Sequence, residues 1–112
     1  MSPMFLAHPL FWLIVGHALA DFPLQGDFLA MAKNRNTPLG QQFWFYALPA
    51  HAMIHAGFVA AVTGSITLGI AEAVIHALTD FFKCEKRIGM AIDQLIHLSC
   101  KLLWAAIAVG YM

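Results

Sequence analysis

Long runs of apolar residues, separated by short polar segments, are the dominant pattern in this chain. Four such runs cover residues 4–20, 43–62, 66–82 and 90–111. Each is close to the roughly 17–25 residues that a helix needs to cross about 30 Å of hydrocarbon. None shows the alternation of apolar and polar positions that marks the strands of a membrane barrel. The pattern predicts an all-α fold in which residues 1–112 form one integral membrane bundle of four transmembrane helices.

A segment of mixed polarity separates the first two runs. It covers residues 21–33 and contains Pro23, which should end the first helix near Asp21. Proline lacks a backbone N–H and disfavours a helical conformation in the residue before it. We expect the rest of the segment to form a short helix at the membrane interface after the first span.

The composition agrees with a membrane protein and argues against other classes. Hydrophobic residues make up 61% of the chain and charged residues 11%, whereas an ordinary soluble domain has about 25% charged residues. So few charges cannot cover the surface of a water-soluble monomer of this size. Six basic side chains balance six acidic ones, and no basic patch indicates nucleic-acid binding.

Basic residues lie in two of the three connections between the predicted spans. Lys33 and Arg35 lie in the first connection, and Lys83, Lys86 and Arg87 lie in the third. Residues 63–65 carry no charge, so the positive-inside rule makes the first and third connections cytoplasmic. We therefore expect a multi-pass protein of the bacterial inner membrane with both termini outside. Residues 18–20 resemble a signal cleavage site, but the apolar run lacks the preceding basic residues of a signal peptide.

Ionisable side chains inside the predicted spans recur at intervals of four residues. The groups are His17 with Asp21, His51 with His55, Glu72 with His76 and Asp80, and Asp93 with His97. A four-residue interval places side chains on the same face of a helix. Measured from the cytoplasmic connections, all nine fall in the same half of the membrane, so four helices can present them as one cluster. Because ionisable groups inside a membrane are costly, so many at one depth indicate a function.

Imidazole and carboxylate groups together are typical ligands of zinc, manganese and iron ions. We expect eight of the nine residues to be metal ligands, namely His17, Asp21, His51, His55, His76, Asp80, Asp93 and His97. One ion needs about four ligands, so this set suits two divalent ions, or one ion with further residues around its ligands. The spacing of His51 and His55 matches a metalloprotease helix, but Ala52 stands where that helix has glutamate, which excludes the class.

The same residues carry a resemblance to a known family. The sequence His17-Ala-Leu-Ala-Asp21-Phe-Pro-Leu-Gln25, the Asp93-Gln94-x-x-His97 motif and the histidine motifs between them resemble small bacterial and phage membrane proteins of domain of unknown function 3307. The resemblance covers nearly the whole chain and implies no established activity. A looser similarity is to membrane-bound metal-dependent hydrolases, which also carry histidines and acids on apolar helices.

These features favour a membrane-embedded, metal-dependent hydrolase that acts on a lipid-like phosphate or ester at the cytoplasmic leaflet. The metal would activate a bound water and polarise a phosphoryl or acyl oxygen. Glu72, one turn deeper than His76, is the best candidate for the general base, because burial favours proton uptake by a carboxylate. Lys33, Lys83 and Arg87 are expected to hold an anionic head group at the cytoplasmic mouth. Membrane lipids, the substrate and a second copy of the chain are the expected partners.

The sequence leaves three other interpretations. Chains of Asp, Glu and His inside spans also occur in ion or proton transport modules, although the outer halves of these spans have no charged continuation. The groups could instead satisfy one another and serve only as structural contacts between helices. Haem binding by histidines on different helices is the poorest match, because acidic residues accompany the histidines.

Overall fold

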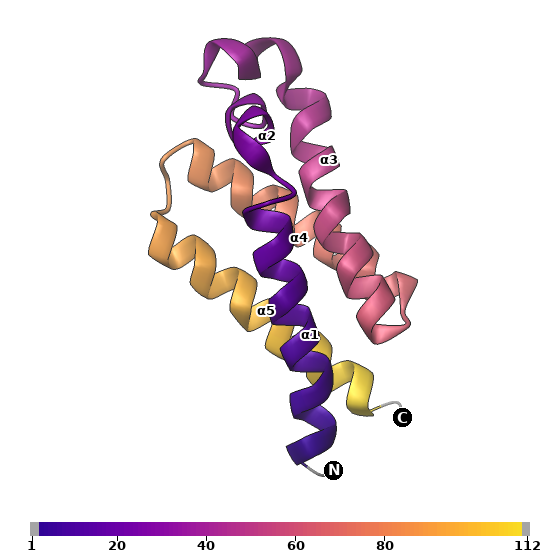
Figure 1. Ribbon diagram of the computed structural model, residues 1–112. Helices are drawn as coiled ribbons and strands as arrows, with labels where there is room; N and C mark the ends of the chain where they lie inside the picture. The colour runs from indigo at the N-terminus through magenta and orange to yellow at the C-terminus, as the bar shows by residue number, and fades with distance from the viewer. Residues whose placement is uncertain (1–2, 111–112) are drawn as a thin grey trace.

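The computed structural model describes residues 3–110, with side chains from residue 6 onward, and consists of five helices. They are α1 (Pro3–Asp21), α2 (Gly26–Ala32), α3 (Pro38–Thr63), α4 (Ile66–Cys84) and α5 (Met90–Gly110), as Figure 1 shows. No strand occurs within the described residues, so the prediction of an all-α fold is confirmed. Tyr111, near the end of the last predicted span, lies outside the described residues.

Local sequence explains the path between α1 and α3. α1 ends at Asp21, before the proline that was expected to stop it, and α2 is the predicted short helix. α3 begins at Pro38, earlier than the predicted apolar run at residues 43–62. The reason is capping, because the side chain of Thr37 accepts a hydrogen bond from the backbone N–H of Gly40 at 2.9 Å. Proline in the first turn of a helix has no N–H to leave unsatisfied, so it extends the helix at no cost.

Residues with left-handed backbone geometry end α3 and α4. Gly64 follows α3 with a φ of 72°, a conformation that glycine adopts without strain. Ser65 then begins α4 by accepting a backbone hydrogen bond with its side chain. Lys86 occupies the equivalent place after α4 with a φ of 62°. The N–H of Arg87 donates to the carbonyl of Phe82 at 3.0 Å across this turn, as in a Schellman motif.

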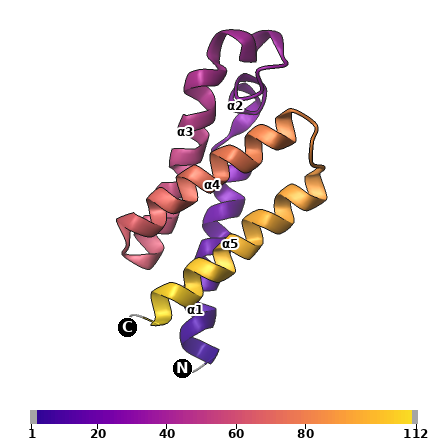
Figure 2. The same cartoon turned by 180° about the vertical axis from the view of Figure 1, so that it is seen from behind.

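The helices form an elongated bundle, 49 × 23 × 22 Å, in which α3 contacts each of the other four helices. Both ends of the described chain lie at one end of the bundle, away from α2 and the α4–α5 connection (Figures 1 and 2). The first and third connections meet, because Arg35 forms an ion pair with Glu85 and the side chain of Asn36 donates to the carbonyl of Cys84 at 3.1 Å. The two connections that carry basic residues therefore share one side of the bundle.

Two of the helices, α3 and α5, are long and apolar enough to cross a membrane by length and composition. α1 contributes a shorter apolar helix, Leu6–Asp21. α4 has 19 residues and includes Glu72, Asp80 and Lys83. Each of the four predicted spans corresponds to a helix, but only two of these helices are apolar over the length of a span. The prediction of four spans stays a prediction.

Burial is inverted relative to a typical soluble protein. Large apolar side chains lie on the outside, with Phe45 72% exposed and Ile66 75% exposed. The interior contains a small apolar core of Leu13, Val59, Trp104 and Ala105 and a set of buried histidines, carboxylates and lysines. An apolar exterior around a polar interior suits an apolar environment, since exposed apolar patches of this extent mark contact with a membrane or a partner.

Candidate metal centre

Five histidines from four helices meet in the interior. α1 contributes His17, α3 contributes His51 and His55, α4 contributes His76, and α5 contributes His97, and each is at most 5% exposed. The ring centroid of His55 lies 5.3 Å from that of His17 and 4.8 Å from that of His51. We call these five residues the histidine cluster. The expected convergence of the four helices on one buried cluster is confirmed.

His76 lies at the centre of the histidine cluster. Its ring stacks on His55 with a centroid distance of 3.7 Å and on His97 with a centroid distance of 4.1 Å. Its side chain is 1% exposed, and neither ring nitrogen has a hydrogen-bond partner among the described residues. Oε2 of Glu72 is 3.7 Å from Nδ1 of His76, too far for a hydrogen bond. Buried polar atoms normally have partners, so these nitrogens are available to a ligand.

Asp21, at the end of α1, brings three histidines together. Its Oδ1 lies 2.8 Å from Nε2 of His55 and 3.4 Å from Nε2 of His51. Its Oδ2 lies 3.2 Å from Nε2 of His17. Three imidazoles thus converge on one carboxylate, and this set of nitrogen and oxygen atoms has the chemistry of a divalent metal site.

Gln94 links α5 to α1 beside this carboxylate. Its amide nitrogen donates to Oδ2 of Asp21 and to Oδ2 of Asp93, both at 3.2 Å, and its amide oxygen lies 2.9 Å from Nε2 of His17. Oδ1 of Asp93 in turn lies 3.2 Å from Nε2 of His97. Gln94 was noted in the sequence only as the neighbour of Asp93, and the structure makes it a bridge between two helices of the site.

Possible ligand atoms gather in two groups that share His76. The first group is Asp21, His51, His55 and His76, and the second is Glu72, His76 and His97. Within each group the ligand atoms lie within 4.8 Å of one another. Four and three protein ligands are the numbers that structural and catalytic zinc sites use. Five of the eight predicted ligands lie in these groups, and Glu72, predicted as the general base, joins the second.

The other three predicted ligands, His17, Asp80 and Asp93, lie outside the two groups. Asp80 is 1% exposed, and its carboxylate lies 2.7 Å from Nζ of Lys33 and 3.2 Å from Nζ of Lys83. Two ammonium groups therefore neutralise Asp80 in this structure. The helix spacing placed Asp80 on the same face as His76, but its immediate neighbours make it an ion-pair partner.

The lysines expected at the cytoplasmic mouth differ in their placement. Lys33 is 4% exposed, and besides Asp80 it contacts Oε1 of Gln25 at 2.5 Å. Its ammonium therefore faces the interior, in contrast to the predicted position at the mouth. Lys83 is 23% exposed, and its Nζ lies 3.8 Å from Oδ2 of Asp93. Arg87 is exposed, so the three residues predicted to hold a head group do not form one accessible set.

Lys101 is a site residue that the sequence analysis did not assign. It is 1% exposed and forms a hydrogen-bonded ion pair with Oε1 of Glu72, which is 0% exposed. Its position four residues after His97 places both on one face of α5, and this spacing was the available signal. The general-base hypothesis for Glu72 considered burial alone, whereas the structure gives this carboxylate a cationic partner.

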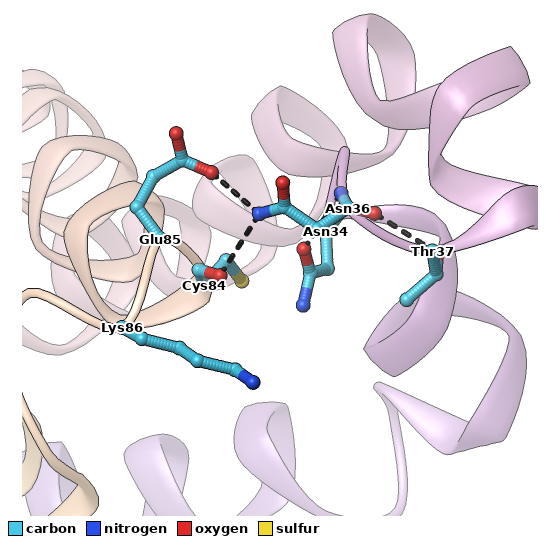
Figure 3. Close-up of a pocket in the computed structure, with 6 residues that line it drawn as sticks. All are labelled: Asn34, Asn36, Thr37, Cys84, Glu85 and Lys86. Carbon is cyan, nitrogen blue, oxygen red and sulfur yellow. Dashed lines mark hydrogen bonds between the residues drawn. The ribbon is translucent and has the colours of Figure 1, made fainter.

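A separate, open polar pocket of about 490 Å³ lies where the first and third connections meet (Figure 3). Asn36 donates to Oε2 of Glu85 at 2.5 Å and to the carbonyl of Cys84 at 3.1 Å. Hydrogen bonds from Arg35 and Asn36 hold the pKa of Glu85 below its ordinary value. No residue that lines this pocket belongs to the histidine cluster, so the pocket is distinct from the candidate metal centre.

Residues 10–111 match a protein family that is described as "Protein of unknown function (DUF3307)". The match includes every residue of both ligand groups. No curated protein and no solved structure matches the chain.

Proposed function

Because this chain belongs to the DUF3307 family, whose description assigns no activity, we propose a function for it from its own residues. The protein is a membrane-embedded, metal-binding hydrolase that acts on a lipid-like phosphate or ester at the cytoplasmic leaflet. The proposal has two parts, metal binding and hydrolysis, and each has its own support and its own test.

Metal binding is supported above all by His76. Its two buried ring nitrogens have no hydrogen-bond partner among the described residues, and it belongs to both ligand groups. A histidine that served only to hold helices together would be expected to pair its ring nitrogens, because an unsatisfied buried polar group costs about 1–3 kcal/mol. A divalent ion in either group would bind one of these two nitrogens. Zinc, manganese and iron suit the mixed nitrogen and oxygen ligands.

Hydrolysis is supported by the place of Glu72, which lies in the second ligand group beside His76. A bound divalent metal supplies an activated water and a Lewis acid. Lys101 pairs with Oε1 of Glu72, which leaves Oε2 as the carboxylate oxygen nearer His76, 3.7 Å from its Nδ1. Oε2 of Glu72 has no hydrogen-bond partner among the described residues, so it is free to accept a proton.

We propose that α1 and α4 also cross the membrane, so that the protein has four spans together with α3 and α5. α4 contains charged residues that are unusual in a membrane span. Two of them, Glu72 and Asp80, point into the bundle and are 0% and 1% exposed. Charges enclosed in this way are compatible with a span. The basic residues in the first and third connections support an orientation with that side in the cytoplasm and both termini outside.

A transport module is the second candidate, and the apolar core disfavours it. The histidine cluster, its carboxylates and Lys101 together form a polar cluster. Leu13, Val59 and Trp104 are at most 5% exposed, and each lies four residues or less from a member of this polar cluster, on the side of the termini. A continuous path for ions or protons would have to cross this core. The polar cluster is therefore better suited to binding than to passage.

The metal content of the purified full chain tests the proposal. We expect stoichiometric zinc, manganese or iron in the wild-type protein in detergent, and a clear loss of metal in His76→Ala. His8→Ala is the matched control, because His8 is an exposed histidine outside the cluster, and it should keep its metal. Size-exclusion chromatography and circular dichroism check that each variant is folded.

A second variant separates metal binding from catalysis. Glu72→Gln keeps the shape of the side chain but cannot take up a proton, so turnover of lipid phosphates should fall by on the order of a hundredfold or more. Full metal occupancy in folded His76→Ala would contradict the ligand assignment. Haem absorbance, or the absence of metal from the wild type, would contradict the whole proposal.

A further inference from the structure

We propose that Gln94 is a positioning residue of the metal centre, which holds the carboxylate of Asp21 so that one of its two oxygens faces the histidines of the first ligand group. This inference rests on the proposed metal binding and gives a role to a side chain that belongs to neither ligand group. It requires only one ion, bound by the group that contains Asp21.

The two carboxylate oxygens of Asp21 have different surroundings. Oδ1 lies 2.8 Å from Nε2 of His55 and 3.4 Å from Nε2 of His51, and both histidines belong to the same ligand group as Asp21. Oδ2 contacts two side chains outside that group, the amide nitrogen of Gln94 and Nε2 of His17, each at 3.2 Å. Oδ1 is therefore the oxygen that faces the ligand group, and Oδ2 is the oxygen that other side chains hold.

The position of Asp21 in the chain explains why its carboxylate needs such a contact. It is the last residue of α1, and the ends of helices fray. The torsion that turns an aspartate carboxylate about its Cβ–Cγ bond is also broad. Gln25 donates to the main-chain carbonyl of Asp21 at 3.1 Å, which fixes the backbone but not the carboxylate. Gln94 belongs to α5, so its hydrogen bond ties the carboxylate itself to a second helix.

The neighbours of Gln94 also set the orientation of its amide. Its nitrogen donates to Oδ2 of Asp21 and to Oδ2 of Asp93, and its oxygen lies 2.9 Å from Nε2 of His17. An amide nitrogen only donates and an amide oxygen only accepts, so the reverse orientation would place the oxygen against two carboxylates. Carboxylates that bind metals are commonly held by hydrogen bonds of this kind, and loss of such a partner typically weakens metal binding about tenfold to a hundredfold.

The experiment measures Co²⁺ binding to the full chain in detergent, after removal of bound metal and then of the chelator. The visible absorption of Co²⁺ depends on its ligands and their geometry, so one titration gives both the dissociation constant and a spectrum of the site. Gln94→Met removes the amide at a similar side-chain length. Gln25→Met is the matched control, because Gln25 is also half-buried and also bonded to Asp21, but at the main-chain carbonyl.

We expect Gln94→Met to weaken Co²⁺ binding about tenfold to a hundredfold and to change the spectrum, whereas Gln25→Met should match the wild type in both. In a protein that already carries Asp21→Ala, Gln94→Met should weaken binding no further, because the effects of two residues that act through one contact do not add. Size-exclusion chromatography and circular dichroism check that each variant is folded. If Gln94→Met does not fold, Gln94→Asn takes its place, since this amide is one carbon shorter, and it should weaken binding in the same direction.

Three results would overturn the positioning role and leave the metal proposal intact. The first is wild-type affinity and spectrum in the folded Gln94 variant. The second is an equal loss of affinity with and without the carboxylate of Asp21, since Gln94 would then act elsewhere. The third is a loss of the same size in Gln25→Met, since any contact to the end of α1 would then have this effect. If the wild type does not bind Co²⁺, the metal proposal and this inference are both overturned.

Discussion

The buried ion pair between α4 and α5 offers the sharpest test of how the bundle encloses its charges. Lys101→Met removes the ammonium and keeps most of the side-chain length. Glu72 is 0% exposed, so the change leaves a carboxylate in the interior without the ammonium that pairs with its Oε1. Breaking one partner of a buried pair typically costs about 3–5 kcal/mol, because the remaining charge has lost both water and its counter-ion. We expect a loss of that size in the free energy of unfolding.

A second substitution should recover most of this loss. In the double variant Glu72→Met with Lys101→Met, two apolar side chains of similar length replace the pair. Replacement of a buried ion pair by packed apolar residues is often neutral or stabilising. The double variant should therefore lie close to the wild type and far from the sum of the two single changes, which is the pattern of residues in direct contact.

The assay is unfolding in mixed detergent micelles, followed by circular dichroism, for all four proteins of the cycle. A chelator must be present, because an ion held by Glu72 and His76 would replace the missing ammonium and hide the loss. Lys86→Met is the control, since Lys86 is exposed and its change should shift the free energy by no more than about 0.5 kcal/mol. If Lys101→Met behaves like this control, or if the two single losses simply add, the pair does not stabilise the interior.

Two further predictions concern the connections between the helices. In a background without the native cysteines, Arg35→Cys should react with an impermeant thiol reagent from the cytoplasmic side of membrane vesicles and Ser65→Cys from the opposite side; reaction from one side at both positions would refute four spans. The second prediction is that Glu85→Gln reduces stability at neutral pH and that its difference from the wild type disappears in acid. The pKa of Glu85 is lowered in the folded protein, so its contribution exists above its ordinary pKa and is lost as the pH falls through the folded value. Unfolding of both proteins at about pH 7 and about pH 3 measures this, and a difference that persists unchanged in acid would contradict the role of the carboxylate.

Features that depend on neighbours along the chain could be predicted from the sequence. The apolar runs indicated four long helices because a membrane or a core requires apolar faces of that length, and Pro23 marked the end of α1. The beginning of α3 was misplaced because the prediction followed hydropathy, whereas Thr37 and Pro38 begin a helix through backbone hydrogen bonding.

The convergence of the histidines was also predictable, because side chains four residues apart share a helix face whatever the surrounding fold. Only the tertiary structure decided which acid meets which partner. Asp80 shares a face with His76 but lies one turn nearer the connections, where Lys33 and Lys83 reach it. Glu72 lies one turn deeper than His76, where Lys101 crosses from α5. Such pairings depend on the relative heights and rotations of neighbouring helices, which arise from packing between segments far apart in the chain, and a periodic pattern within one helix contains no information about them.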